Sequence, residues 1–158
     1  MSAPGCVFCG IVAGTEPGSV VHTEDDVVAF LTTAPINPGH VLVVPRAHAV
    51  GLDDLSAATG EALWRLTHRV AVALRRDPAW SEGVNLHLSD GAAAGQHVFH
   101  LHMHVIPRFS GDGLRVIDDR PERPPRAALD DVATRLREVL AAEGRARGAA
   151  RRRRSPST

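Results

Sequence analysis

Apolar positions along the chain follow a period of two, or run on without interruption, in five short segments. These segments are residues 19–22, 27–31, 41–45, 84–88 and 98–106. Successive side chains of a β-strand point to opposite faces of a sheet, so such segments predict strands. An acidic turn, Glu24-Asp25-Asp26, follows the first segment, and a loop punctuated by Pro and Gly, APINPGH, precedes the third.

Two longer segments repeat their apolar residues every three or four positions, which is the spacing of an amphipathic α-helix. The first runs from Leu52 to about Arg76, where Asp77-Pro78 stops it, and the second covers residues 128–140. The expected buried positions are Leu55, Leu63, Leu66, Val70 and Leu74 in the first helix, and Leu129, Val132, Leu136, Val139 and Leu140 in the second. This order of strands and helices predicts an α+β fold with a mostly antiparallel sheet.

The segment HVFHLHMHVIPR, residues 97–108, concentrates histidine on the last predicted strand. His100, His102 and His104 alternate with apolar residues, so a strand would place the three imidazoles on one face, about 7 Å apart. Imidazole binds metals and also titrates near neutral pH. Taken alone, the pattern therefore admits a metal site, a nucleophilic or acid–base site, or a solvated strand face.

Composition changes this picture mainly at the C-terminus. With 158 residues, 44% hydrophobic and 23% charged, the chain has the make-up of one globular domain with its own core. The formal charge of zero hides a division, because six of the 18 basic residues lie after residue 144, where no acidic residue occurs. We therefore expect a domain over residues 1–144 and an arginine-rich, disordered tail over residues 145–158. The acidic body argues against a general nucleic-acid-coating role, and only the tail is suited to weak binding of polyanions.

The chain shows no feature that would direct it to a membrane. No apolar run reaches membrane-spanning length, and the N-terminus lacks the basic start and apolar core of a secretory signal. We therefore expect a cytoplasmic protein with no membrane partner. In that reducing compartment, Cys6 and Cys9 are better suited to be free thiols or metal ligands than a structural disulfide.

Several further motifs accompany the histidine segment. CVFCGIVAG, EDDVVAFL, PGHVLVVPRAH and GQHVFHLHMHVIPR follow one another over residues 5–110. Together they resemble the histidine triad (HIT) family, and in particular its bacterial branch with an N-terminal C-x-x-C. The resemblance implies a HIT domain, with a five-stranded, mostly antiparallel sheet and two helices in each subunit of a homodimer.

The same resemblance implies nucleotide chemistry at the histidines. The chain is expected to be a nucleotidyl hydrolase or transferase, in which His102 attacks the α-phosphorus and forms a covalent nucleotidyl–histidine intermediate. A neutral imidazole is suited to this attack when its other nitrogen donates to a fixed acceptor. His104 would neutralise phosphate oxygens or assist the leaving group. Gln96 and neighbouring backbone N–H groups would stabilise the developing charge.

The resemblance gives the first triad histidine a different role. In the bacterial branch, the C-x-x-C, the histidine of PRAH and the first triad histidine bind one structural zinc. Carried over to this sequence, the ligands are Cys6, Cys9, His48 and His100. A closed tetrahedron of two sulfurs and two nitrogens is what structural zinc prefers. The alternative is a pair of unmetallated thiols packed in a small N-terminal turn.

Three residues depart from the family pattern at nucleotide-binding positions. Thr32 stands where the family commonly has Asp or Asn for the ribose hydroxyls, and Ser89 where it often has Asn or Gln near the phosphate. His97 replaces the usual Ser or Thr after the glutamine. A hydroxyl makes one hydrogen bond to ribose but not the paired grip of a carboxylate. These three residues, with Gln96 and His104, form the expected nucleotide-binding set.

Three functions follow from these observations. The first is hydrolysis of a purine nucleoside monophosphate joined to an amine or similar leaving group. The second is hydrolysis or phosphorolysis of dinucleoside polyphosphates by the same His102. The third is a zinc-stabilised nucleotide-binding scaffold with incidental turnover. Among the other histidines, His87 is expected to be structural, and His22 and His68 are expected to be exposed.

Overall fold

The structure, a computed structural model of the chain, describes residues 3–114 and 124–154. The chain divides into two compact units, Met1–Gly113 and Leu114–Thr158. The first unit contains the sheet, and the domain boundary expected at residue 144 stays a prediction. Within the described residues, no helix has the length and apolarity needed to cross a membrane.

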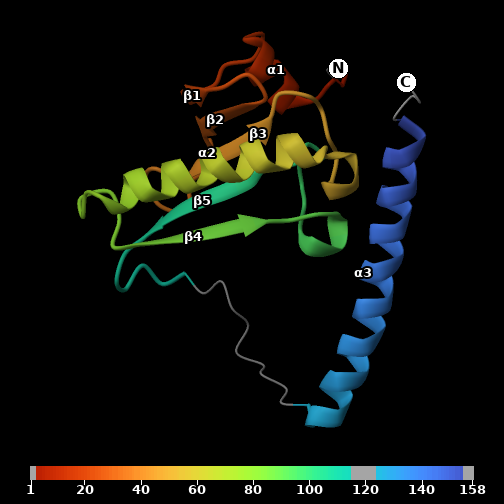
Figure 1. Cartoon of the computed structure of the whole chain (residues 1–158). Helices are drawn as coiled ribbons and strands as arrows, with labels where there is room; N and C mark the ends of the chain where they lie inside the picture. The colour runs from red at the N-terminus through yellow and green to blue at the C-terminus, as the bar shows by residue number, and fades with distance from the viewer. Residues whose placement is uncertain (1–2, 115–123, 155–158) are drawn as a thin grey trace. The chain divides into compact units, whose positions relative to one another are not determined.

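Five strands form one antiparallel sheet in the first unit (Figure 1). They are β1 (Val20–Thr23), β2 (Val27–Leu31), β3 (Val41–Pro45), β4 (Gly83–Leu88) and β5 (Met103–Arg108). Their order across the sheet is β1-β2-β3-β5-β4, so β1 and β4 are edges and the histidine strand β5 lies in the interior. Each neighbouring pair is antiparallel, which confirms the predicted α+β class and five-stranded sheet.

Helix α2 (Ala57–Arg75) covers one face of the sheet (Figure 1). Ser56 caps its start, because the Ser56 Oγ accepts a hydrogen bond from the N–H of Thr59 at 3.1 Å. Leu63 and Leu66 are buried against apolar residues of β2, β3 and β5. Removal of this apolar surface from water holds the helix on the sheet. The first predicted helix is therefore confirmed, apart from its first turn.

The opposite face of the sheet carries a second core beneath a short helix, α1 (Val7–Ala13). Phe8 of α1 packs against Phe30 of β2, with ring centroids 5.3 Å apart. The sequence predicts two helices in total, so α1 is an addition. Seven residues are too few to establish a helical period, and Gly10 within them lowers the helix propensity. The helix ends at Gly14, whose φ of 74° is left-handed and costs glycine no strain.

The histidine segment forms a regular strand only in its second half. Strand β5 begins at Met103 and contains His104, whereas the first two triad histidines precede it. The sequence predicts a strand over residues 98–106. The observed strand starts later, because no residue of β3 or β4 pairs with residues 98–102. Met103 is the first residue of β5 that pairs with β3 and β4. Before it the chain turns toward Ala49, whose carbonyl accepts a hydrogen bond from the N–H of Leu101 at 2.7 Å.

The second unit contains helix α3 (Arg126–Arg154). It includes the helix predicted over residues 128–140 and continues into the segment that the sequence predicts to be disordered. Alanine and arginine are strong helix formers, which accounts for the extension; residues 155–158 lie outside the described part of the chain. The apolar residues expected to be buried on this helix are instead exposed: Leu129, Val132, Leu136, Val139 and Leu140. The described part of this unit has no other helix or strand to cover them.

Candidate functional site

Four potential metal ligands from distant parts of the chain meet beside the histidine segment. The N-terminal segment supplies Cys6 and Cys9, the residues after β3 supply His48, and the residues before β5 supply His100. One ligand atom of each lies within 4.8 Å of the other three. Nδ1 of His100 lies 3.4 Å from Sγ of Cys6 and 3.6 Å from Sγ of Cys9. Nδ1 of His48 lies 3.4 Å from Sγ of Cys9.

The spacing and chemistry of these four groups suit zinc. Zn–S bonds of about 2.3 Å and Zn–N bonds of about 2.0 Å place sulfur and nitrogen ligands about 3.5 Å apart in a tetrahedron. Nε2 of the buried His100 donates to the carbonyl of Pro45 at 2.9 Å, so its lone pair is on Nδ1, the atom beside the sulfurs. Burial raises the pKa of the Cys9 thiol, and a bound cation is the usual means of holding such a sulfur as thiolate.

His102 is the next histidine of the triad, and its ring has a different environment. Its Nδ1 is 2.7 Å from the backbone oxygen of His100. A carbonyl oxygen only accepts hydrogen bonds, so Nδ1 must carry the proton and Nε2 the lone pair. The ring edge of Phe8 covers one side of His102, with centroids 5.2 Å apart. No described residue forms a hydrogen bond with Nε2 of His102, although the residue as a whole is only 7% exposed.

The proton of His104 is on the ring nitrogen opposite to that of His102, and a hydrogen bond from His40 places it there. His40, which precedes β3, is buried, and its Nδ1 accepts a hydrogen bond from the N–H of Ile36 at 3.3 Å. The neutral His40 ring therefore carries its proton on Nε2, which donates to Nδ1 of His104 at 2.9 Å. Neutral His104 is left with its proton on Nε2. The site thus combines a lone pair on His102 with a donor on His104, and the two ring centroids are 4.8 Å apart.

Burial keeps these imidazoles neutral. Removal from water disfavours the charged ring, and so it lowers the pKa of His40 and of His102. Burial, with the charges of His102, His40 and His87, lowers the pKa of His104 to about 4. At neutral pH, His102 therefore keeps the lone pair that a nucleophile needs.

Strand β4 places a further imidazole beside His104. His87 lies directly opposite His104 in the β4–β5 ladder, and the ring centroids are 5.8 Å apart. Nε2 of His87 is 2.9 Å from Oγ of Ser89, a residue that is only 5% exposed, whereas His87 itself is exposed. The sequence predicts a purely structural histidine here, but the register brings it to the same sheet face as His104.

Thr32 and His97, two expected nucleotide-binding residues, lie in different surroundings. Thr32 follows β2, and its N–H donates to the carbonyl of His40 at 3.2 Å. Thr32 therefore lies next to one of the candidate reactive histidines, a name used for His40, His102 and His104. His97 lines a cavity of about 410 Å³ together with Cys6 and His48. The structure therefore places Thr32 beside His40, and His97 beside two of the four potential metal ligands.

Gln96 is a third expected nucleotide-binding residue, and its amide group is fully engaged within the protein. The residue is 3% exposed, and its Oε1 accepts from the N–H of Gly91 at 2.8 Å. Its Nε2 donates to the carbonyls of Val50 and Val98 at 2.7 and 3.2 Å. Gln96 therefore ties together the loop that leads into the histidine segment.

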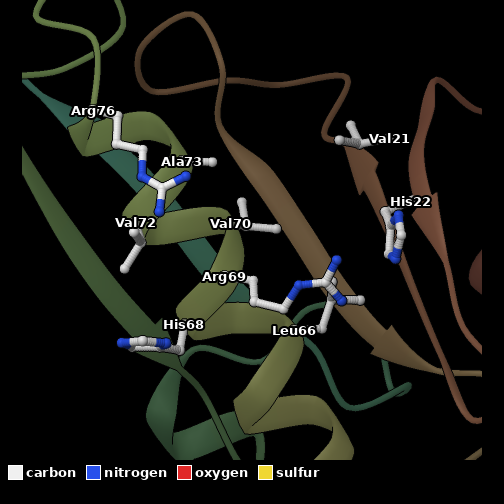
Figure 2. A pocket seen from close by; sticks show the side chains of 9 residues that line it. All are labelled: Val21, His22, Leu66, His68, Arg69, Val70, Val72, Ala73 and Arg76. Carbon is white, nitrogen blue, oxygen red and sulfur yellow. The ribbon is translucent and has the colours of Figure 1, made fainter.

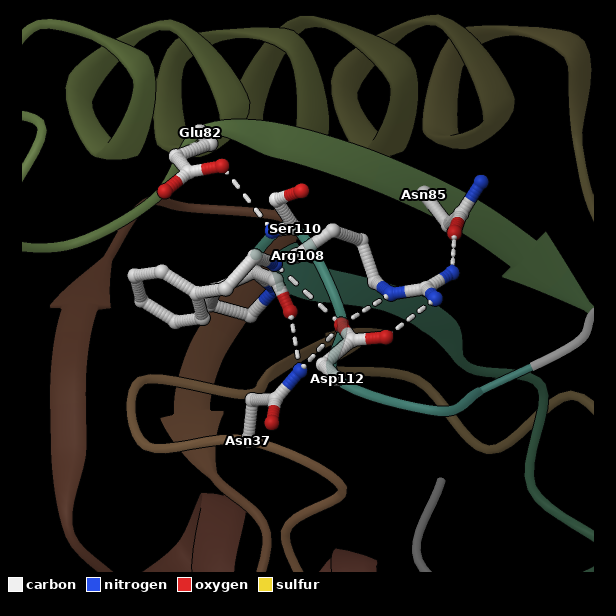
Figure 3. Close-up of polar contacts among 8 residues, drawn as sticks. Asn37, Glu82, Asn85, Arg108, Ser110 and Asp112 are labelled. Atoms are coloured by element: carbon white, nitrogen blue, oxygen red, sulfur yellow. Dashed lines mark hydrogen bonds and ion pairs between the residues drawn. The ribbon is translucent and has the colours of Figure 1, made fainter.

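A polar network braces the loop that holds His40 (Figure 3). Nε and one terminal nitrogen of Arg108 donate to the two carboxylate oxygens of Asp112, each at 2.7 Å. Asn37 donates to the backbone of β5 and to Asp112, both at 2.9 Å. The carbonyl of Asn37 accepts a hydrogen bond from the N–H of His40 at 3.1 Å. The network therefore fixes His40, and through it the tautomer of His104.

Two histidines of this site escape the sequence pattern. His40 lies within PGHVLVVP and His87 within VNLHL, so each belongs to a segment remote from the triad. Periodicity shows which residues share a face of one strand, but register between strands decides which side chains lie side by side. The histidine of the PGH motif was available as a signal, because that motif is part of the family resemblance.

A cavity of about 540 Å³ lies away from the reactive histidines, between α2 and β1. Figure 2 shows Leu66 and Arg69 of α2 on the side of the helix next to Val21 and His22 of β1. Helix α2 packs on Val41 and Val43 of β3. Leu42 lies between them and points to the other face of the sheet, and it pairs with His104, so α2 and His104 lie on opposite faces. This cavity therefore does not belong to the histidine site.

Comparison with known proteins identifies the family of the chain. The family model described as HIT domain matches residues 13–111. The protein hit of Bacillus subtilis is 35% identical over 140 residues, which cover 85% of this chain and 96% of the relative. A Zn-bound histidine triad family protein from Mycobacterium smegmatis is 36% identical, with a TM-score of 0.67 over 82% of this chain and 96% of its own. A histidine triad nucleotide-binding protein from Candida albicans is 26% identical, with a TM-score of 0.78 over 87% of this chain and 99% of its own.

The chain belongs to the histidine triad family, as its motifs predict. Membership of this family indicates nucleotide-related hydrolase or transferase chemistry.

Proposed function

We propose that this protein cleaves nucleoside monophosphate conjugates through a covalent intermediate on His102. The observation that carries the proposal is the opposite polarity of two neighbouring imidazoles. Nε2 of His102 has a lone pair, because the carbonyl of His100 holds its Nδ1 proton, and Nε2 of His104 has a proton, because His40 donates to its Nδ1. A nucleophile beside a proton donor is the pair that substitution at phosphorus requires.

The chemistry divides into two balanced steps. In the complex, Nε2 of neutral His104 donates to the α-phosphate or to the leaving atom, while its Nδ1 keeps the hydrogen bond from His40. The lone pair of His102 forms a bond to the α-phosphorus, and the leaving group departs with the electrons of its own bond and takes a proton from solvent. Water then attacks the phosphorus, the phosphorus–nitrogen electrons return to His102, and the proton of the attacking water passes to solvent. An acceptor other than water would make the same protein a transferase.

We propose that Cys6, Cys9, His48 and His100 hold one structural zinc ion. Zinc would fasten the N-terminal segment and the residues after β3 to the histidine segment. The cluster also bears on the nucleophile, since the backbone oxygen of the ligand His100 orients the ring of His102. The match between the sulfur–nitrogen distances and a zinc tetrahedron supports this assignment.

The nucleotide-binding residues divide into direct and indirect contributors. Thr32 borders His40, and its hydroxyl, whose oxygen accepts from the N–H of Ala34 at 3.2 Å, can still donate one hydrogen bond to a ribose. Gln96 orders the loop before the histidines, since its own amide is engaged. Ser89 lies beside His87, and a phosphate contact by His97 stays a prediction. We take the ligand to be a purine nucleotide.

Turnover separates this proposal from a nucleotide-binding scaffold. Wild-type protein should release AMP from adenosine 5′-phosphoramidate or from diadenosine tetraphosphate. His102→Ala should lower the rate by at least about 10⁴-fold, whereas its affinity for AMP should fall only a few-fold, because several groups bind the phosphate. Wild-type protein that binds AMP but releases none from either substrate would favour the scaffold.

We also propose that the protein is a cytoplasmic homodimer. Strand β4 is a sheet edge, and Leu86 on it and Trp64 on α2 are exposed apolar side chains, 38% and 55% accessible. Such an edge next to large apolar groups favours association. Free cysteines arranged as metal ligands suit a reducing compartment. Sedimentation velocity should show a dimer, and Leu86→Glu should shift it toward monomer; a monomeric wild-type protein would contradict the proposal.

A further inference from the structure

We propose that His87 and Ser89 form a phosphate subsite on the leaving-group side of His102, so that nucleoside phosphoanhydrides are better substrates than phosphoramidates of neutral amines. This inference rests on the proposed function and specifies its substrate class. The two residues stand on the edge strand β4 and immediately after it.

The two sides of the reactive histidines differ in chemistry. On one side, Phe8 of α1 lies 5.2 Å from His102, by ring centroids, and packs on Phe30 of β2. Thr32 follows the same strand β2. Phe8 and Phe30 are themselves buried and support this side from within, and the hydroxyl of Thr32 is the group on it that suits a ribose. Because β5 lies between β3 and β4, a nucleoside bound over β2 and β3 leaves the β4 side for the rest of the substrate.

The β4 side presents hydrogen-bond donors next to the position of reaction. His87 faces His104 across the ladder, and its Nε2 lies 2.9 Å from the Ser89 hydroxyl. Because the two groups hydrogen-bond to each other, the pair keeps one free donor, either Nδ1–H of His87 or the hydroxyl of Ser89, for a phosphate oxygen. His87 is exposed, so a ligand can reach it, while the buried Ser89 is held in place.

The groups around this pair suit an anion. The ring of His87 lies beside that of His104, with centroids 5.8 Å apart. Asp90 follows Ser89 in the chain, but its carboxylate accepts a hydrogen bond from the N–H of Leu52 at 3.3 Å, on the loop before α2. An anionic group therefore meets donors and imidazoles here.

Such a subsite discriminates between leaving groups. When a phosphoanhydride reacts with His102, the bridging oxygen leaves with the electrons of the broken bond, and negative charge grows on a phosphate. The His87–Ser89 pair can donate its free hydrogen to an oxygen of that phosphate. When a phosphoramidate reacts, the nitrogen takes a proton and leaves as a neutral amine, which brings no phosphate oxygen to the subsite. The pair therefore lowers the barrier for the first reaction selectively.

The test compares two substrates that transfer the same adenylyl group. Values of kcat/KM are measured with diadenosine tetraphosphate and with adenosine 5′-phosphoramidate. The ratio of the first value to the second should fall about tenfold or more in His87→Leu and about threefold in Ser89→Ala, as expected for lost hydrogen bonds to a charged group. His87→Gln keeps a donor and should retain most of the preference. His68→Leu, a matched change at an exposed histidine of α2, should leave the ratio unchanged. Equal losses with both substrates, or an unchanged ratio in His87→Leu, would overturn the subsite.

A binding measurement tests the subsite without turnover. Calorimetric titration with inorganic pyrophosphate should show about tenfold weaker binding to His87→Leu than to wild type, while AMP binding stays within about twofold. If His87→Leu shows this selective loss of pyrophosphate binding, but wild-type protein turns over neither substrate, the proposed function fails and the subsite stands. If turnover depends on His102 but His87→Leu changes neither pyrophosphate binding nor the substrate ratio, the subsite alone fails.

Discussion

His100 and His102 stand two residues apart, yet their surroundings suit them to different work. Both ring nitrogens of His100 are engaged: Nε2 donates to the carbonyl of Pro45, and Nδ1 lies beside the sulfurs of Cys6 and Cys9. Within the described residues, His102 has one engaged nitrogen, Nδ1, and its Nε2 has no hydrogen-bond partner. The number of ring nitrogens without a hydrogen-bond or ligand partner, rather than the H-x-H-x-H spacing, therefore distinguishes the two imidazoles.

One hydrogen bond nevertheless joins the cluster of potential metal ligands to the candidate reactive histidines. The backbone oxygen of His100 accepts a hydrogen bond from Nδ1 of His102 at 2.7 Å, so a residue proposed to bind zinc also orients the ring of the proposed nucleophile. Changes to the cluster should therefore affect stability first and turnover through orientation. Changes to the reactive histidines should affect turnover and leave the metal in place.

The largest expected effect lies on the metal side. Purified wild-type protein should hold about one zinc ion per chain, and Cys9→Ser should lose it. The free energy of unfolding should then fall by several kcal/mol, a part of the ~10 kcal/mol that zinc contributes in small metal-dependent domains, because this fold also has its own core. Metal analysis and denaturant unfolding measure both quantities. Wild-type protein without zinc, or an unchanged unfolding curve for Cys9→Ser, would contradict the structural role proposed for His100 and the other three ligands.

Substitutions at His104 and His40 should lower the turnover rate and leave the zinc content unchanged. His104→Ala should lower turnover of adenosine 5′-phosphoramidate by about 10²–10³-fold, as loss of one donor to a developing charge typically does. His40→Leu should cost about tenfold, since His40 acts by fixing the tautomer of His104. Both variants should keep their zinc and their melting temperature. Loss of zinc in either variant would show that the two regions are not separate.

Acid should weaken the fold through the reactive side. The folded-state pKa of His104 is about 4, below its ordinary value of 6.5, so the unfolded chain binds more protons between these two values. The free energy of unfolding should therefore fall as the pH drops from 6.5 toward 4, by about 1–2 kcal/mol from this residue after allowance for its partial exposure. Denaturant unfolding at pH 7 and pH 4.5 should show a smaller fall in His104→Asn than in wild type. The same fall in both proteins would argue against the neutral imidazole.

The smallest expected effect concerns the arginine-rich tail. Deletion of residues 145–158 should leave zinc content and turnover unchanged, because the proposed ligands and reactive histidines all lie in the first compact unit. The deletion should abolish only weak binding to a polyanion such as heparin. A large loss of turnover or of dimer on truncation would show that the tail has a further role.

The sequence predicts the parts of this molecule that depend on local periodicity and on motifs. The alternation of apolar residues predicts the five strands, and helical spacing predicts α2. The family resemblance predicts the grouping of the metal ligands, which the structure brings together. Helix α1 is too short to show a period. Residues 98–102 alternate like a strand but have no ladder partner, so their pattern misleads.

The remaining features depend on contacts between distant segments. His40 and His87 reach the site because β3 and β4 flank β5 in a particular register, which periodicity within one strand does not encode. The engagement of the Gln96 amide likewise depends on carbonyls supplied by a separate loop. The apolar stripe of α3 has helical spacing, but spacing alone does not provide a surface to cover it.

Intact-protein mass spectrometry after incubation with adenosine 5′-phosphoramidate or diadenosine tetraphosphate tests the central claim most directly. Wild-type protein should gain the mass of one adenylyl group, and peptide mapping should place it on His102. His104→Ala should retain part of the adduct, and His102→Ala should show none. An adduct of undiminished yield in His102→Ala, or one mapped to His100, would contradict the division between a reactive and a structural histidine.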